Sequence, residues 1–271
     1  MLSRVGRFDK RIAAMRSYRT AITAAFVSVL AGNPAVAEEV RNRTDYTIAL
    51  AGLRLADARF HARRNGERYE IDAEIASTGL GEFLANTKAR MSSAGEVRGG
   101  RFLPSKFMFR YKYGKRQRLF ETRFEGGNVV SSIVEPQPKK RRKGWIPVQP
   151  EDLKSVTDPV AGLVMPGDGD PCRGKIPVYD GESRLDLRLS RKREQPFTTE
   201  GFSGPAIVCA LRYEPKSGYR KGHRDVEYVR RLTNMEIWFA KSTPMDVYAP
   251  VFLSVPTKYG TLTVTATRFE G

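Results

Sequence analysis

The chain has 271 residues, of which 40% are hydrophobic, and it carries a formal net charge of +17. This length allows one large domain or two smaller ones with a substantial buried core, and we expect one. The excess of positive charge suits an acidic partner, although it can also serve solubility alone.

The first 37 residues have the three parts of an export signal. A basic stretch that runs from Arg4 to Arg19 precedes an apolar stretch at residues 21–31, and the A-x-A cleavage signal follows at Ala35–Ala37. The apolar stretch is too short to cross a bilayer, which takes about 20 residues. We therefore predict that residues 1–37 are a signal peptide and that cleavage occurs near Ala37. Residues 38–271 would then form a single periplasmic β-rich domain, soluble rather than membrane-spanning.

Export also restricts the choice of an acidic partner. Outside the cytoplasm, nucleic acid is not the expected partner of a basic protein. The partners that remain are anionic lipid head groups, lipopolysaccharide phosphates, lipoprotein or an acidic glycan.

Strands with one buried face are predicted along most of residues 38–271, because apolar and polar residues alternate with a period of two. Clear alternation is found at residues 69–75, 107–113, 185–189 and 262–266, with turn signals such as Asn65-Gly66 between the strands. A short helix is predicted at Asp158–Leu163, with Asp158 as the N-cap and Pro159 in the first turn, and a second at residues 81–86. Many short strands need protected edges. We therefore predict an all-β protein with a single curled antiparallel sheet and one or two short helices.

One strand carries a row of aromatic side chains that all point to the same face. The row is formed by Phe107, Phe109, Tyr111 and Tyr113. If the interior of the curled sheet is filled, these rings belong to the core. If the interior is hollow, they line a cavity. The sequence leaves both interpretations open.

The strand pattern stops between about residues 135 and 150. Four prolines flank an uninterrupted basic tract, Lys139, Lys140, Arg141, Arg142 and Lys143. Such a tract repels itself and should be an exposed loop. It is either a solvated connection or a contact to an anionic surface, where each basic residue contributes about 1 kcal/mol.

The two cysteines, Cys172 and Cys209, are predicted to form a disulfide, because an exported chain with an even number of cysteines is usually bridged. The bridge closes a loop of 38 residues, for which loop entropy gives a stabilisation of about 4 kcal/mol. A zinc site is not expected. It needs four closely spaced ligands, and His61 and His223 are the only histidines.

No catalytic, metal or cofactor site is predicted from the remaining residues. Neither histidine has a recognisable catalytic signature around it. Gly201–Gly204 lacks the spacing of a nucleophile elbow, and Gly167–Asp170 lacks the further ligands of a calcium loop. Glu74 and Glu236 could act as an acid and base pair, but the charged face of a strand explains them more simply.

Several short strings recur in a characteristic order along residues 46–269. They are Tyr46–Leu53, Ser93–Gly95 with Gly100–Pro104, Asp158-Pro159, Pro171–Gly174 with Val178–Gly181, Val208-Cys209 with Tyr213, Ile237–Phe239, Pro250 and Gly260–Val264. In order and spacing they resemble domain-of-unknown-function family 3108, an uncharacterised exported bacterial family. The basic tract at residues 139–143 departs from that pattern.

The resemblance implies a periplasmic β-rich protein without an established activity, similar to the curled half-barrels of lipoprotein carriers. In such folds the concave face can hold an acyl chain, a lipoprotein tail or a peptide. We therefore expect a non-catalytic protein of the cell envelope that holds a hydrophobic or anionic envelope component or supports envelope integrity.

Two alternatives remain. An exported hydrolase of an acidic envelope glycan would show two buried carboxylates roughly 5 to 9 Å apart in a cleft. A scaffold that docks other envelope proteins would show a long, uncharged edge strand.

Overall fold

The computed structural model describes residues 39–271, with gaps at residues 80, 83–85, 139–140, 142 and 173. All described residues belong to one compact unit, Ala37–Gly271. The predicted signal peptide lies outside the described residues, and the predicted helix at residues 81–86 lies partly outside them.

The described residues form strands almost throughout, with three short helices. The first half of the chain contains β1 (Val40–Leu50), β2 (Leu53–Asn65), β3 (Arg68–Ser77), β4 (Thr87–Arg98), β5 (Arg101–Tyr113), β6 (Arg116–Glu125) and β7 (Asn128–Glu135). The second half contains β8 (Trp145–Ile146), η1 (Pro150–Leu153), η2 (Ala161–Leu163), β9 (Met165–Pro166), β10 (Gly174–Tyr179), β11 (Arg184–Thr199), β12 (Phe202–Ser217), β13 (Tyr219–Arg220), α2 (Arg224–Arg231), β14 (Met235–Ser242), β15 (Val247–Thr257) and β16 (Gly260–Phe269).

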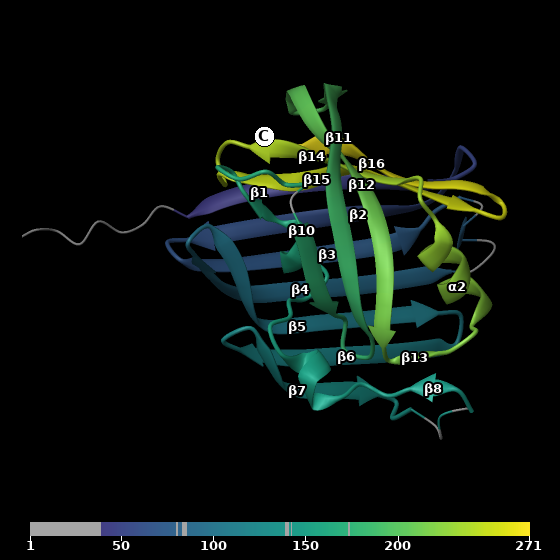
Figure 1. Ribbon diagram of the computed structural model, residues 1–271. Coiled ribbons are helices and arrows are strands. Elements are labelled where there is room, and N and C mark those ends of the chain that lie inside the picture. The colour runs from purple at the N-terminus through teal and green to yellow at the C-terminus, as the bar shows by residue number, and fades with distance from the viewer. Residues whose placement is uncertain (1–38, 80, 83–85, 139–140, 142, 173) are drawn as a thin grey trace, which may run out of the picture. The chain divides into compact units, whose positions relative to one another are not determined.

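One large antiparallel sheet contains all the long strands, in the order β10-β11-β12-β14-β15-β16-β1-β2-β3-β4-β5-β6-β7. The short strand β9 adds to β15, and β8 and β13 form a separate pair. The two halves meet where the last strand pairs with the first, from Thr44 opposite Phe269 to Leu50 opposite Leu262. In Figure 1 the purple-to-teal strands β1–β7 form a broad curved wall, and the green strands β10–β12 run across it. The predicted all-β fold with a single curled antiparallel sheet is confirmed.

The connection between β8 and β10 fills the space inside the curled sheet. Val156, Val160 and Ala161 pack on the inner face of β3–β7, while Leu163 and Met165 pack on β10–β12 and β14. Gly162 lies between the two, and a Cβ atom there would come within 2.7 Å of the Thr157 side chain. The segment for which the sequence predicts a short helix at Asp158–Leu163 therefore forms the centre of the core, and its helix is the 3₁₀ turn η2 at Ala161–Leu163.

The same connection bonds to both edges of the open sheet, along β10 and at the start of β7. At β10, the Thr157 N–H donates to the Pro177 carbonyl and the Tyr179 N–H donates to the Thr157 carbonyl, both at 2.9 Å. At the start of β7, the Val156 N–H donates to the Gly127 carbonyl at 2.8 Å. β7 and β10 do not pair with each other as strands. The sheet therefore curls around its filling without closing.

Candidate ligand cavity

An apolar cavity of about 260 Å³ lies between β1–β5 on one side and η2 with β14–β16 on the other. Most of its wall is aliphatic or aromatic, with Phe60, Met91, Leu163, Met245 and Val264 as representatives of its different elements. The volume exceeds the roughly 150 Å³ of an apolar cavity that binds benzene. It lies slightly below the roughly 300 Å³ at which pockets for drug-sized ligands begin. The cavity therefore fits a slender hydrocarbon group.

The polar side chains of the cavity wall already have hydrogen-bond partners in the protein. Asn42 donates from Nδ2 to Ser242 Oγ at 3.1 Å, and Thr44 donates to Asn42 Oδ1 at 3.3 Å. The Tyr46 hydroxyl donates to the Pro250 carbonyl at 2.6 Å. A guest in the cavity would therefore meet apolar contacts and satisfied polar groups, which favours hydrocarbon over a polar ligand.

An apolar strip continues from the cavity along the inner face of the sheet. Val264 in the wall is opposite Ile48, and Leu50 is opposite Leu262, which is itself opposite Val255. These side chains are only half-buried, although they point to the inner face. The strip leads towards the turns that join β1 to β2 and β15 to β16.

The row of aromatic side chains on β5, which the sequence left open as core or cavity lining, does not form the wall of this cavity. Phe107 is 1% exposed and belongs to the core under the β8–β10 connection, and Phe109 packs against the same cluster. Tyr111 is half-buried, and Tyr113 is 52% exposed. From β5, only Phe102 reaches the cavity, because the filling segment occupies the space over Phe107.

Asp158 is fully buried beside the cavity and holds η2 against the sheet. Its Oδ1 accepts the N–H groups of Val160 and Ala161 at 2.7 and 2.9 Å, as predicted for a cap. Its Oδ2 accepts the Ser93 hydroxyl at 2.7 Å, and the Tyr69 hydroxyl lies 3.2 Å from Ser93 Oγ. Burial raises the pKa of Asp158 to about 6, although these hydrogen bonds lower it. Since Val160 lines the cavity, Asp158 positions part of the wall.

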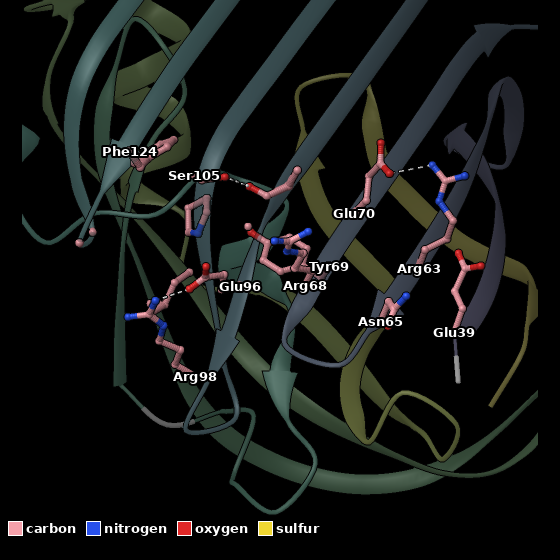
Figure 2. Close-up of a pocket in the computed structure, with 16 residues that line it drawn as sticks. Glu39, Arg63, Asn65, Arg68, Tyr69, Glu70, Glu96, Arg98, Ser105 and Phe124 are labelled. Atoms are coloured by element: carbon pink, nitrogen blue, oxygen red, sulfur yellow. Dashed lines mark hydrogen bonds and ion pairs between the residues drawn. The ribbon is translucent and has the colours of Figure 1, made fainter. Parts of the chain in front are cut away.

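A second hollow, of about 550 Å³, lies at the hairpin ends of β2–β3, β4–β5 and β6–β7. Figure 2 shows its charged rim. Its carboxylates are partly exposed and ion-paired: Glu70 with Arg63 at 3.0 Å, Glu39 with Arg41 at 2.8 Å, and Glu96 with Arg98. An exported hydrolase would need two buried carboxylates in a cleft, and the carboxylates that line this hollow do not form such a pair.

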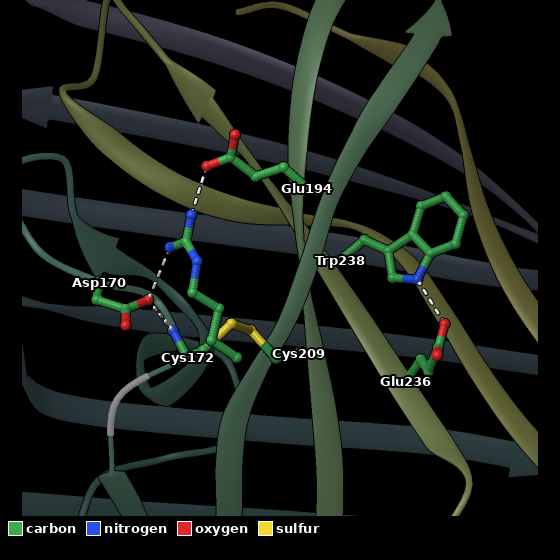
Figure 3. The surroundings of a disulfide bond; sticks show 7 residues. Asp170, Cys172, Glu194, Cys209, Glu236 and Trp238 are labelled. Carbon is green, nitrogen blue, oxygen red and sulfur yellow. Dashed lines mark hydrogen bonds and ion pairs between the residues drawn. A yellow bond between two sulfur atoms is a disulfide. The ribbon is translucent and has the colours of Figure 1, made fainter.

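The predicted disulfide between Cys172 and Cys209 is present, with 5.3 Å between the Cα atoms. It joins the segment before the edge strand β10 to β12, the third strand from that edge, and both cysteines are buried. Figure 3 shows that Asp170 also anchors this segment. Its Oδ1 accepts the Cys172 N–H at 3.0 Å and lies 3.4 Å from the Arg191 guanidinium.

The basic tract lies partly outside the described residues, at Lys139, Lys140 and Arg142. Arg141 is engaged within the protein: its guanidinium lies 2.7 Å from Glu182 and 4.0 Å from the centre of the Trp145 ring. Lys143 is exposed. Of the two described cations in the tract, one is therefore occupied and one is available for a surface contact.

The two histidines lie on different elements of the fold. His61 on β2 and His223 before α2 are both exposed. Within the described ranges, no group of three or more His, Cys, Asp or Glu side chains could hold a metal ion. Over the same ranges, no helix is long and apolar enough to cross a membrane.

Fold and cavity together define an all-β protein built on one open, curled antiparallel sheet. The chain belongs to the family described as "Protein of unknown function (DUF3108)", whose model matches residues 45–267. The predicted family is thereby confirmed.

Comparison with solved structures finds a beta-barrel-like protein of domain of unknown function DUF1849 from Brucella abortus. It is 9% identical and has a TM-score of 0.43, and the match covers 85% of this chain and 97% of that chain. No curated protein matches the chain.

Proposed function

We propose that this protein is a non-catalytic periplasmic component of the cell envelope that holds one hydrocarbon chain of a lipid or lipoprotein. The observation that carries the proposal is the apolar cavity with its half-buried apolar strip. Burial of each methylene group contributes about 0.8 kcal/mol. Affinity should therefore rise with chain length until the cavity and the strip are filled.

A bulky side chain in the wall tests this proposal. Ala62 on β2 lines the cavity, and Ala62→Phe should weaken binding of a saturated fatty acid at least about tenfold, since it occupies the space of several methylene groups. Affinities would be measured by isothermal titration for fatty acids of increasing length.

The matched control is Ala76→Phe, which adds the same ring at an exposed position on β3 and should bind as the unmodified protein does. Circular dichroism would verify that both variants fold. Equal binding by both variants, or an unmodified protein without affinity for any of these acids, would exclude an acyl-chain site at this cavity.

The edge strand β7 favours docking of another envelope protein as a second candidate function. Residues 128–134 carry no charge, and Val130 and Ile133 are 52% and 47% exposed. An exposed apolar edge can accept an added strand. A bulge between β6 and β7 works against such pairing, which places this candidate second.

Ile133→Lys should abolish any complex formed through the β7 edge, because a charged side chain blocks strand addition. Chemical cross-linking in intact cells would compare the discrete adducts of the unmodified protein with those of the variant. Tyr259→Lys, at an 82% exposed position on the β15–β16 turn, is the control. Adducts that persist unchanged in Ile133→Lys would rule out this edge as the docking site.

A further inference from the structure

The outward faces of β4 and β5 place like charges directly opposite one another. Lys88 is opposite Lys112, and Arg90 is opposite Arg110. All four side chains are exposed. Directly opposed like charges destabilise a sheet, so the fold keeps this arrangement at the expense of its own stability.

Like charges also face one another elsewhere in the sheet, but there acidic side chains lie beside them. Arg41 is opposite Arg63, and Lys175 is opposite Arg188, and each of the four forms an ion pair with a carboxylate. A further pair, Lys106 and Arg123, is bridged by Glu121 at 3.4 and 3.8 Å. Lys88 and Lys112 differ from these pairs because neither lysine forms an ion pair within the described ranges.

The cations of this surface are largely without acidic partners. In the described part of the chain, Lys88, Arg110 and Lys112 form no ion pair, whereas Arg90 bonds Glu74 at 3.0 Å. On β6, the residues opposite Arg110 and Lys112 are the uncharged Leu119 and Gln117. Glu135 lies one strand further, opposite Leu119.

The end of the β5–β6 hairpin extends the positive surface. Lys115 lies in this turn and forms no ion pair within the described ranges. Clustered lysine and arginine side chains are typical of contacts with anionic membrane surfaces.

We infer that the outward face of β4–β5, together with the β5–β6 turn, docks the protein onto an anionic phospholipid surface. We define the docking face as Lys88, Arg90, Arg110, Lys112 and Lys115. The charges lie on the outside of a sheet and on a turn, carried by long flexible side chains, which suits a fluid layer of phosphates better than the fixed charges of a folded protein. The inference is independent of the cavity, because none of these residues lines it.

Co-sedimentation with vesicles tests the docking face. The protein should bind vesicles of phosphatidylcholine mixed with phosphatidylglycerol, lose binding as salt is raised, and not bind vesicles of phosphatidylcholine alone. The triple variant Lys88→Gln, Arg110→Gln, Lys112→Gln should bind the mixed vesicles at least about tenfold more weakly. Its melting temperature should equal or exceed that of the unmodified protein, because repulsion across the strands is relieved.

The control variant removes the same number of positive charges beside α2, as Arg212→Gln, Lys221→Gln and Arg224→Gln, and should bind almost as the unmodified protein does. Equal losses in the two variants would show that net charge rather than this face governs binding. Failure of the unmodified protein to bind the mixed vesicles at low salt would also overturn the inference, and would point to a different acidic partner.

Discussion

Cys172→Ser should lower the melting temperature of the oxidised protein by about 10 °C. The disulfide closes a loop of 38 residues, which corresponds to about 4 kcal/mol in the loop-entropy model. For a protein of this size each kcal/mol shifts Tm by about 2 to 4 °C. The loss should be large because the bridge fixes the segment before the edge strand β10 to the interior strand β12.

The measurement is thermal unfolding of the unmodified protein and the variant, each with and without a reductant. With reductant present, the two proteins should melt at nearly the same temperature, because neither has the cross-link. A variant that melts lower by the same amount in both states would mean that the serine acts through packing and that the bridge contributes nothing.

The second large effect is a loss of stability as pH rises from about 4 to about 6, caused by Asp158. The unfolded carboxyl has a pKa of about 3.9, whereas burial raises the pKa of Asp158 in the folded protein to about 6. Between these values the folded state holds a proton that the unfolded state has released, so stability falls with rising pH. The difference of about two pKa units corresponds to about 3 kcal/mol.

Asp158→Asn removes this dependence and keeps the local structure. The side-chain oxygen can still accept the N–H groups of Val160 and Ala161, and the new amide can donate to Ser93. The free energy of unfolding of the variant, minus that of the unmodified protein, should increase by about 3 kcal/mol as the pH is raised from about 4 to above about 6. Denaturant unfolding at a series of pH values measures this difference.

Other carboxyl groups with shifted pKa values also contribute to the pH dependence of stability, but they are common to both proteins. Burial raises the pKa of Asp180, while the hydrogen bond from Arg193 lowers the pKa of Glu236 to about 2. Their contributions cancel when the two stability curves are subtracted. Parallel curves for the unmodified protein and Asp158→Asn would therefore contradict a protonated Asp158 in the folded state.

Strand alternation predicted the class of the fold because it is a local property of the chain. Residues 69–75 and 107–113 lie within β3 and β5, and the row that begins at Tyr69 is buried on one face. The even number of cysteines, together with the predicted export signal, predicted the disulfide for an equally simple reason. Both predictions needed only spacing and residue type.

The cavity could not be predicted from local patterns because its wall combines segments from both ends of the chain. β1 meets β16 through a pairing with no signature in either strand, and Asn42 bonds Ser242 across 200 residues. The inner row of β1, with Tyr46 and Ile48, alternates as clearly as the row at Phe107. Which row lines a cavity depends on where the β8–β10 connection packs, and the short helix predicted within that connection does not indicate its position against the sheet.

Native mass spectrometry of the protein purified from the periplasm under gentle conditions tests the proposed function most directly. We predict a species heavier than the polypeptide by the mass of one acyl-chain lipid, and its loss in Ala62→Phe but not in Ala76→Phe. A protein that carries no lipid, and that takes up none when incubated with an envelope lipid extract, would contradict the proposal that this cavity holds a hydrocarbon chain.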